Sequence, residues 1–100
     1  RFAKMWINFG TGKAKGVDSE FYLTTKEALV MKLLIEKKGA VVGREELLEK
    51  VWGYDPQTET RTVDNFISRL RKYFEKIPQE PRHIVTVREK GYQFESGSKG

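Results

Sequence analysis

The strongest constraint on the fold of this chain is an amphipathic segment over residues 61–74. At about 100° per residue, its apolar side chains gather on one side of a helix and its cationic and polar side chains on the other. The apolar side carries Val63, Ile67, Leu70, Phe74 and Ile77, and is widened by Phe66 and Tyr73. The opposite side carries Arg61, Asn65, Ser68, Arg69, Lys72 and Lys76. The first set predicts a core contact, and the second predicts a surface open to an anionic partner.

Size and charge narrow the class of protein. A chain of 100 residues with 38% hydrophobic residues can bury one core but not two. We therefore expect one domain over residues 1–95 and a flexible tail over 96–100. The formal net charge is +5, and its excess lies in residues 61–94, which hold 8 cations against 4 anions. Such a distribution suits nucleic acid or an anionic membrane surface.

Other functional classes are disfavoured. The chain has no cysteine and His83 is its only histidine, so a disulfide framework and the usual zinc ligand sets are excluded. No motif places a serine or a carboxylate pair for catalysis, so we predict no enzyme activity, cofactor or metal. No apolar run approaches the roughly 20 residues that span a bilayer, and we expect a cytoplasmic fragment without membrane contact. Because the chain begins at Arg1, we expect it to belong to a longer protein.

The N-terminal half predicts a sheet followed by a helix. Residues 5–9 alternate, with Met5, Ile7 and Phe9 on one face and Trp6 on the other, and further short strands are expected at 14–17 and 21–23. Thr24 and Glu27 then match a capping box, so a helix is expected over about 25–38, followed by Gly39 in a left-handed conformation. Its inward positions are Ala28, Met31, Leu34 and Ile35.

The second half predicts two more helices and a hairpin. Residues 41–42 lead into a short helix that ends near 52–53, and its inward positions are Leu47, Leu48 and Val51. Residues 54–59 are expected to form a loop, and the third helix to cover about 61–76. The β-rich runs 83–88 and 92–95 predict a hairpin, with Gly91 taking a left-handed turn position.

Four sequence blocks, in order and at matching spacing, resemble the OmpR/PhoB class of response-regulator effector domains. They read LTxKE at 23–27, VxRExLLxxVWG at 42–53, RTVDxxISRLRK at 61–72 and TVRxxGYxF at 86–94. The resemblance implies an α+β winged helix-turn-helix with an N-terminal antiparallel β-sheet, three helices and a C-terminal β-hairpin wing. It also implies sequence-specific binding to double-stranded DNA and transcription regulation, as the output domain of a two-component phosphorelay response regulator.

The same resemblance implies partners. From it we expect the third helix to enter the major groove of promoter DNA and the wing to reach the minor groove. It also implies that pairs of domains bind direct repeats head to tail, that a phosphorylatable receiver domain precedes the domain, and that loop 53–60 touches RNA polymerase. Two alternatives stay open: a winged-helix protein-interaction module without duplex binding, and the cytoplasmic DNA-binding head of a membrane-bound one-component regulator.

The polar residues of the third helix divide by chemistry. Asn65 and Arg69 carry the donors and acceptors that read base edges, whereas Arg61 and Lys72 suit phosphates. Ser68 shares their face. Arg69, Arg71 and Lys72 coincide with DNA-facing positions of the family. Arg71 lies at the flank of the stripe, where it either contacts the groove or pairs with Asp64 or Glu75.

Four further candidates have two interpretations each. Asp64 orients an arginine or accepts a hydrogen bond from cytosine, and Thr62 either binds a phosphate or, like Thr60, caps the helix. Trp52 belongs to the core, or donates its indole N–H to a phosphate as the resemblance implies. Phe66 stands where many family members have a polar residue, so it either extends the core or contacts a thymine methyl group.

The predicted hairpin carries the remaining candidates. Arg88 suits a narrow A·T-rich minor groove, and Lys90 adds charge beside it. Thr86 and Tyr92 add hydroxyl groups. Glu89 departs from the family pattern, in which many members have glycine, and it brings a carboxylate close to the expected phosphate path. The alternative is an ordinary charged hairpin tip.

Overall fold

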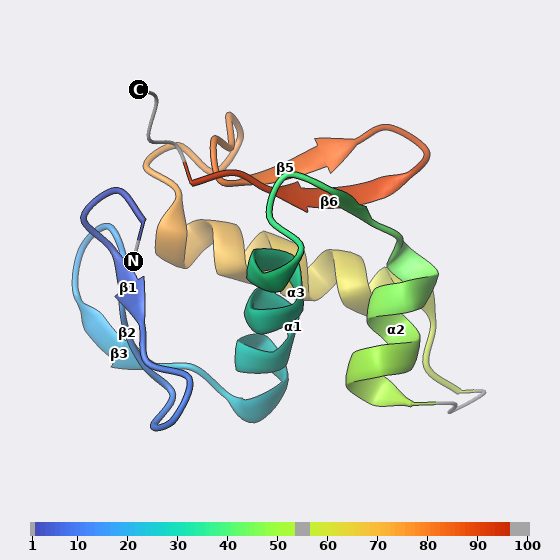
Figure 1. Ribbon diagram of the computed structural model, residues 1–100, viewed down its shortest axis with the longest axis horizontal. Helices are drawn as coiled ribbons and strands as arrows, with labels where there is room; N and C mark the ends of the chain where they lie inside the picture. Colours follow the sequence, from blue (N-terminus) through green and yellow to red (C-terminus); the bar gives the residue numbers. More distant parts are fainter. Residues whose placement is uncertain (1, 54–56, 97–100) are drawn as a thin grey trace.

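The computed structural model describes residues 2–53 and 57–96, which form an α+β fold built around one long helix. In chain order the elements are β1 (Trp6–Ile7), β2 (Lys13–Lys15), β3 (Glu20–Tyr22), α1 (Thr25–Glu36), β4 (Val41–Val42), α2 (Arg44–Trp52), α3 (Thr60–Phe74), β5 (Ile84–Val87) and β6 (Gly91–Phe94). Helix α3 crosses the molecule, with the β5–β6 hairpin on one side and most of α1 and α2 on the other (Figure 1). This arrangement confirms the predicted winged helix.

The N-terminal strands form an antiparallel sheet in the order β1-β2-β3, as predicted. The prediction for Phe9 was wrong: β1 ends at Ile7, so Phe9 lies in the following turn and is 37% exposed. The sheet is joined to the end of α3, because the amide of Val17 donates to the carbonyl oxygen of Tyr73 at 2.9 Å. Glycine at position 16 permits this approach, since a Cβ there would lie 2.2 Å from the same oxygen.

Helix α1 begins with the predicted capping box. The Thr24 hydroxyl accepts a hydrogen bond from the Glu27 amide at 3.2 Å, and the Glu27 carboxylate accepts one from the Thr24 amide at 2.9 Å. The helix ends at Glu36 rather than at residue 38, and Gly39 has the predicted positive φ of 84°. Met31 and Leu34 are buried as predicted, and Ala28 and Ile35 are half-buried; Glu27 and Val30 are buried in addition.

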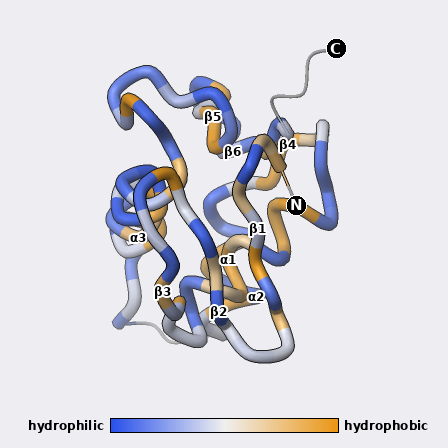
Figure 2. Tube along the Cα trace, turned by 90° about the vertical axis from the view of Figure 1, so that its left-hand side faces the viewer, coloured by the Kyte–Doolittle hydropathy of each residue, from blue (hydrophilic) through white to orange (hydrophobic). Residues whose placement is uncertain are grey.

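Helices α2 and α3 pack against each other through their predicted apolar sides. Leu47 and Val51 of α2 are buried and Leu48 is half-buried. The stripe on α3 is fully buried at Val63, Ile67, Leu70 and Phe74. Figure 2 looks nearly along α3, whose turns carry both hydrophilic and hydrophobic colours, as expected for a helix with one face in the core.

The end of α3 differs from the prediction. The helix stops at Phe74, and Glu75 has an extended backbone with φ −112° and ψ 134°. Its buried carboxylate accepts three consecutive amides, those of residues 82–84, at 2.8–2.9 Å. These bonds direct the chain away from the helix axis. Ile77, predicted to extend the apolar stripe, therefore leaves it and is 51% exposed.

The second sheet has the order β4-β6-β5. Its strand β4 was not predicted, because the sequence pattern indicates only a lead into α2 at residues 41–42. Gly91 has the predicted positive φ, of 146°, but it is the first residue of β6 rather than a turn residue. A Cβ there would lie 2.1 Å from the carbonyl oxygen of Val42 on the neighbouring strand. Glu89 also has a positive φ, of 63°. The position where many family members have glycine thus keeps a conformation that favours glycine.

Candidate nucleic-acid interface

The outer face of α3 presents the predicted polar row to solvent. Arg61, Asn65, Ser68 and Lys72 are exposed and lie opposite the buried stripe. Within residues 2–53 and 57–96, neither Arg61 nor Lys72 forms an ion pair. Their charges are therefore available to an external anion. The residues follow one another at intervals of three or four positions, so they line one side of the helix over its whole length.

Arg69 belongs to the same row but already has partners. Its guanidinium lies 3.4 Å from the buried Glu27 carboxylate of α1 and 4.6 Å from the ring centroid of Phe66. The Arg69 side chain is still 46% exposed. These contacts restrict the side chain to a narrow range of directions while leaving part of the guanidinium accessible. Glu27 was not predicted to take part in the site.

Phe66 and Trp52 together form the base on which Arg69 rests. Their rings meet edge to face, with centroids 4.9 Å apart, and both residues are half-buried. The Lys26 ammonium lies 5.9 Å from the Trp52 ring. Trp52 is one of the partly buried side chains packed against the hydrophobic core, and Phe66 packs on Trp52 beside that core. These contacts favour the core interpretation of Trp52.

Asp64 orients an arginine, which is one of its two predicted roles. The partner is Arg44 at the start of α2, which sequence analysis missed: its Nε and Nη2 donate to the two carboxylate oxygens at 3.0 and 2.5 Å. The Tyr92 hydroxyl on β6 donates to the same carboxylate at 2.6 Å. The position of Arg44 at the start of α2 is the one sequence feature that could have indicated this pair. A cation is unfavourable at the positive end of a helix unless an anion lies nearby.

These contacts shift three ionisation equilibria. Partial burial alone would raise the pKa of Asp64, but the hydrogen bonds from Arg44 and Tyr92 outweigh it and lower the pKa below its usual value. The hydrogen bond to Asp64 raises the pKa of Arg44. Burial, together with the Asp64 hydrogen bond and charge, raises the pKa of Tyr92 to about 12. At neutral pH the group consists of a carboxylate, a guanidinium and a protonated phenol.

Arg71 is bound to the hairpin rather than to either predicted acidic partner. Its Nε donates to the carbonyl oxygen of Ile84 at 2.9 Å and its Nη2 to the Thr86 hydroxyl at 2.8 Å, both on β5. The guanidinium carbon also lies 5.7 Å from the Tyr92 ring centroid. The predicted pairing with Asp64 or Glu75 was wrong, since Asp64 pairs with Arg44 and Glu75 with main-chain amides. The positioning role of Arg71 is the one that these contacts favour.

The start of α3 corrects a second expectation. The N-terminal cap is Glu59 and no side chain makes a capping hydrogen bond there, so capping by Thr60 or Thr62 was wrong. Thr62 is half-buried, and its amide donates to the carbonyl oxygen of Glu59 at 2.9 Å. Among the described residues, the positive end of the helix macrodipole therefore has no side-chain hydrogen bond capping it, although Glu59 stands at the cap position.

The hairpin tip carries charge of both signs. Arg88, Glu89 and Lys90 are all exposed, and they connect β5 to β6 on the side of the molecule where α2 and α3 begin (Figure 1). A hollow bordered by Arg44, Asp64 and Lys90 separates this tip from the starts of α2 and α3. Glu89 and Lys90 thus line one side of a hollow whose opposite wall is formed by the helix starts.

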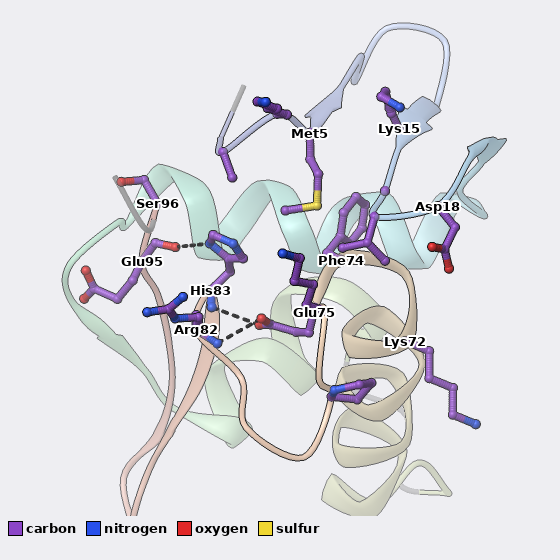
Figure 3. Close-up of a pocket in the computed structure, with 16 residues that line it drawn as sticks. Met5, Lys15, Asp18, Lys72, Phe74, Glu75, Arg82, His83, Glu95 and Ser96 are labelled. Carbon is purple, nitrogen blue, oxygen red and sulfur yellow. Dashed lines mark hydrogen bonds between the residues drawn. The ribbon is translucent and has the colours of Figure 1, made fainter. Parts of the chain in front are cut away.

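A wider, open cavity lies at the other end of α3, and several of the polar groups in its wall form hydrogen bonds within the protein. Figure 3 shows His83 and Glu75 in its wall, with Lys72 pointing outward into solvent. The His83 ring nitrogen Nδ1 lies 2.9 Å from the carbonyl oxygen of Glu95, and Glu75 binds the amides described above. Within the described residues, no group of histidine, cysteine and acidic side chains is arranged to hold a metal ion. Nor is any helix in that part of the chain long and apolar enough to cross a membrane.

Comparison with known sequences gives a consistent family. The family model described as "Transcriptional regulatory protein, C terminal" matches residues 18–94. The transcriptional regulatory protein KdpE of Mycobacterium tuberculosis is 37% identical over 78 residues, which are 78% of this chain and 34% of KdpE. The chain therefore spans about a third of the length of the curated relatives that it matches.

Solved structures agree with this match. The response regulator DrrB of Thermotoga maritima, described as an OmpR/PhoB homolog, superposes with a TM-score of 0.84 at 36% identity, over 95% of this chain and 43% of DrrB. The DNA-binding domain of RstA from Klebsiella pneumoniae, solved in complex with the RstA box, has a TM-score of 0.79 at 32% identity. That similarity covers 96% of this chain and 95% of the RstA domain.

Proposed function

Because this chain belongs to the family of C-terminal domains of transcriptional regulatory proteins, of the predicted OmpR/PhoB type, we propose that it binds double-stranded DNA sequence-specifically and regulates transcription. The observation that carries the proposal is the exposed polar row on α3, opposite a fully buried stripe. Arg61 and Lys72 in that row have no internal counter-ion among the described residues. A row of this length and charge matches the phosphate path of a duplex better than a small anion.

In the proposed complex, α3 lies in the major groove, which is about 12 Å wide and admits a helix. Asn65, Ser68 and Arg69 face base edges. Arg61, Thr62 and Lys72 contact phosphates, which fix the register of the protein on the duplex without reading sequence. Arg88 and Lys90 on the hairpin reach the adjacent minor groove, where negative potential is concentrated if the groove is narrow.

The other predicted contact residues act indirectly in this proposal. Asp64, Arg71, Thr86 and Tyr92 are bonded to one another or to neighbouring main chain, so we assign them to holding the surface in shape. Phe66 and Trp52 support Arg69 from below. We infer that the stack on Phe66 pre-orients Arg69 toward a base, which lowers the entropy lost on binding.

The family also supports a role within a larger protein. We propose that a receiver domain precedes this domain, that the protein is cytoplasmic and belongs to a bacterial two-component system, and that it acts by binding rather than by catalysis. Pairs of domains would bind direct repeats head to tail. Contact with RNA polymerase through loop 53–60 is also proposed, although residues 54–56 of that loop lie outside the described residues.

Salt-dependent titration of a duplex selected from a random pool tests the proposal. If five or six phosphates are neutralised, log K should fall against log salt with a slope of about −5. A protein-interaction module would instead bind every duplex weakly, with little salt dependence, and that result would overturn the proposal.

Two variants separate base reading from phosphate binding. Arg69→Ala should reduce discrimination at one base pair, by about 1–3 kcal/mol, because a bidentate base contact is lost. Lys72→Ala, the matched control on the same face, should weaken all duplexes alike and make the slope shallower by about 1. If both variants changed base preference equally, the assigned division of labour would be wrong.

A further inference from the structure

Two polar contacts join α3 to the hairpin, one to each strand. Near the start of α3, the Asp64 carboxylate accepts a hydrogen bond from the Tyr92 hydroxyl of β6 at 2.6 Å. It also accepts hydrogen bonds from Nε and Nη2 of Arg44. Further along, Arg71 donates to the carbonyl oxygen of Ile84 and to the hydroxyl of Thr86, both on β5. We call these contacts the Asp64 tie and the Arg71 tie.

The spacing of the two ties gives them a mechanical effect. Asp64 and Arg71 are seven residues apart, close to two helical turns, so they lie on the same side of α3 and about 10 Å apart along its axis. The hairpin is also anchored through the pairing of β6 with β4. Two ties at separate points on the helix, each to a different strand, add a direct connection that limits tilting of the hairpin relative to α3.

Tyr92 connects the two ties. Its hydroxyl belongs to the Asp64 tie, and its ring lies 5.7 Å from the Arg71 guanidinium. Tyr92 is only 8% exposed, so the connection is shielded from water. Arg44 brings in a third element, because it is the first residue of α2. The ties therefore hold α2, α3 and the hairpin together at the base of the exposed hairpin tip.

We propose that Arg44 and Asp64 are positioning residues for duplex binding. Acting through Tyr92, they hold the hairpin tip at a fixed place relative to the cations of α3, so that Arg88 and Lys72 meet one duplex as a single preformed surface. The inference rests on the proposed DNA-binding function and deepens it. A preformed surface binds without the entropic cost of ordering the hairpin.

The test compares the same substitution in two backgrounds. In the otherwise unchanged protein, Arg88→Ala should lower duplex affinity and make the salt slope shallower by about 0.9. Asp64→Asn removes the charge that holds Arg44 but preserves side-chain size. In the Asp64→Asn background, the affinity penalty of Arg88→Ala should be at least about threefold smaller, because the tip is no longer held against the duplex.

Lys72→Ala is the matched control. Lys72 projects from α3 itself, so its penalty should be the same with Asp64 or Asn at position 64. A general loss of stability would reduce both penalties together. Amide hydrogen exchange supplies a second readout, since the hairpin amides should exchange faster in Asp64→Asn while those of the buried side of α3 stay protected.

Tyr92→Phe is a milder variant that deletes only the hydroxyl, and it carries the test if Asp64→Asn does not fold. Equal Arg88→Ala penalties in the unchanged protein and in the folded tie variant would overturn the inference and leave the proposed DNA binding intact. If Arg88→Ala has no effect even with both ties present, the hairpin contact itself fails and the inference fails with it. Selection of a specific duplex would still support the rest of the proposed function.

Discussion

Asp64 and Tyr92 illustrate how one contact sets the protonation of both partners. Tyr92 must keep its proton in order to donate to the carboxylate, and both its burial and the nearby negative charge oppose ionisation of the phenol. The pKa of Tyr92 therefore rises from 10.0 to about 12 in the folded protein. The positive charges of Arg71 and Arg44 act on the pKa of Tyr92 in the opposite direction but do not cancel the effect.

This shift predicts a specific alkaline destabilisation. Below pH 10 the phenol is protonated in both states, so its stabilising contribution is complete; the contribution is lost as pH rises through the folded pKa of about 12. We expect unfolding free energy to fall over this window by on the order of 2 kcal/mol more than in Tyr92→Phe. Denaturant unfolding of both proteins at about pH 9 and about pH 11.5 measures the difference. Parallel losses in the two proteins would contradict the assignment.

At this scale the sequence predicts exposure better than it predicts partners. Helical periodicity correctly placed Asn65, Arg69 and Lys72 on the outer face of α3. It could not show that Arg69 meets Glu27, 42 positions earlier, or that Arg71 bonds to β5. Such pairings depend on how distant elements come together, and periodicity along one helix contains no information about them.

Among the elements, α3 combines the largest buried stripe with the candidate binding face. The two faces can be tested separately, because substitutions in the stripe should act on stability. Leu70 is fully buried on α3, whereas Ile77 lies beyond its end and is half exposed.

Leu70→Ala should lower the free energy of unfolding by about 2–5 kcal/mol, because it leaves a cavity between α3 and its neighbours. Ile77→Ala is the matched control, and its effect should stay within about 0.5 kcal/mol. Thermal or denaturant unfolding measures both. Comparable losses at the two positions would mean that Ile77 packs against the core, as the sequence pattern predicts.

The limits of prediction at the level of elements have physical causes. The capping box fixed the start of α1, because all of its bonds are local. The end of α3 was missed because Glu75 is held by amides of residues 82–84, which lie beyond the helix. Strand β4 was missed because its two residues gain a strand conformation only by pairing with β6, some 50 positions later.

As a whole, the molecule measures 38 × 29 × 22 Å, with α3 running across it. The four sequence blocks predicted this fold correctly through their resemblance to a known family, and residues of three blocks meet in the structure at Asp64. The longest dimension runs along α3 (Figure 1), and the other two, 29 and 22 Å, are shorter than the roughly 34–36 Å of one turn of a duplex. Two copies bound one turn apart would therefore fit end to end along the duplex on the same face without overlap.

This size predicts a dependence on half-site spacing. Two copies should bind cooperatively to direct repeats whose centres are about 10–11 base pairs apart. Insertion of about 5 base pairs rotates one site to the opposite face and should abolish cooperativity while leaving single-site affinity unchanged. Gel-shift titration of the two duplexes resolves singly and doubly bound species. Cooperativity that survives the insertion would argue against end-to-end pairing.

The residues of the two ties are also distinct from the residues proposed to face base edges. None of Asn65, Ser68 and Arg69 belongs to either tie, so in the proposed complex substitutions at these positions would change target preference while the ties stay in place. With the ties unchanged, single substitutions on the outer face of α3 would be enough to give related domains different preferred DNA sequences. The same freedom makes the outer face of this helix a natural place to engineer new sequence preference.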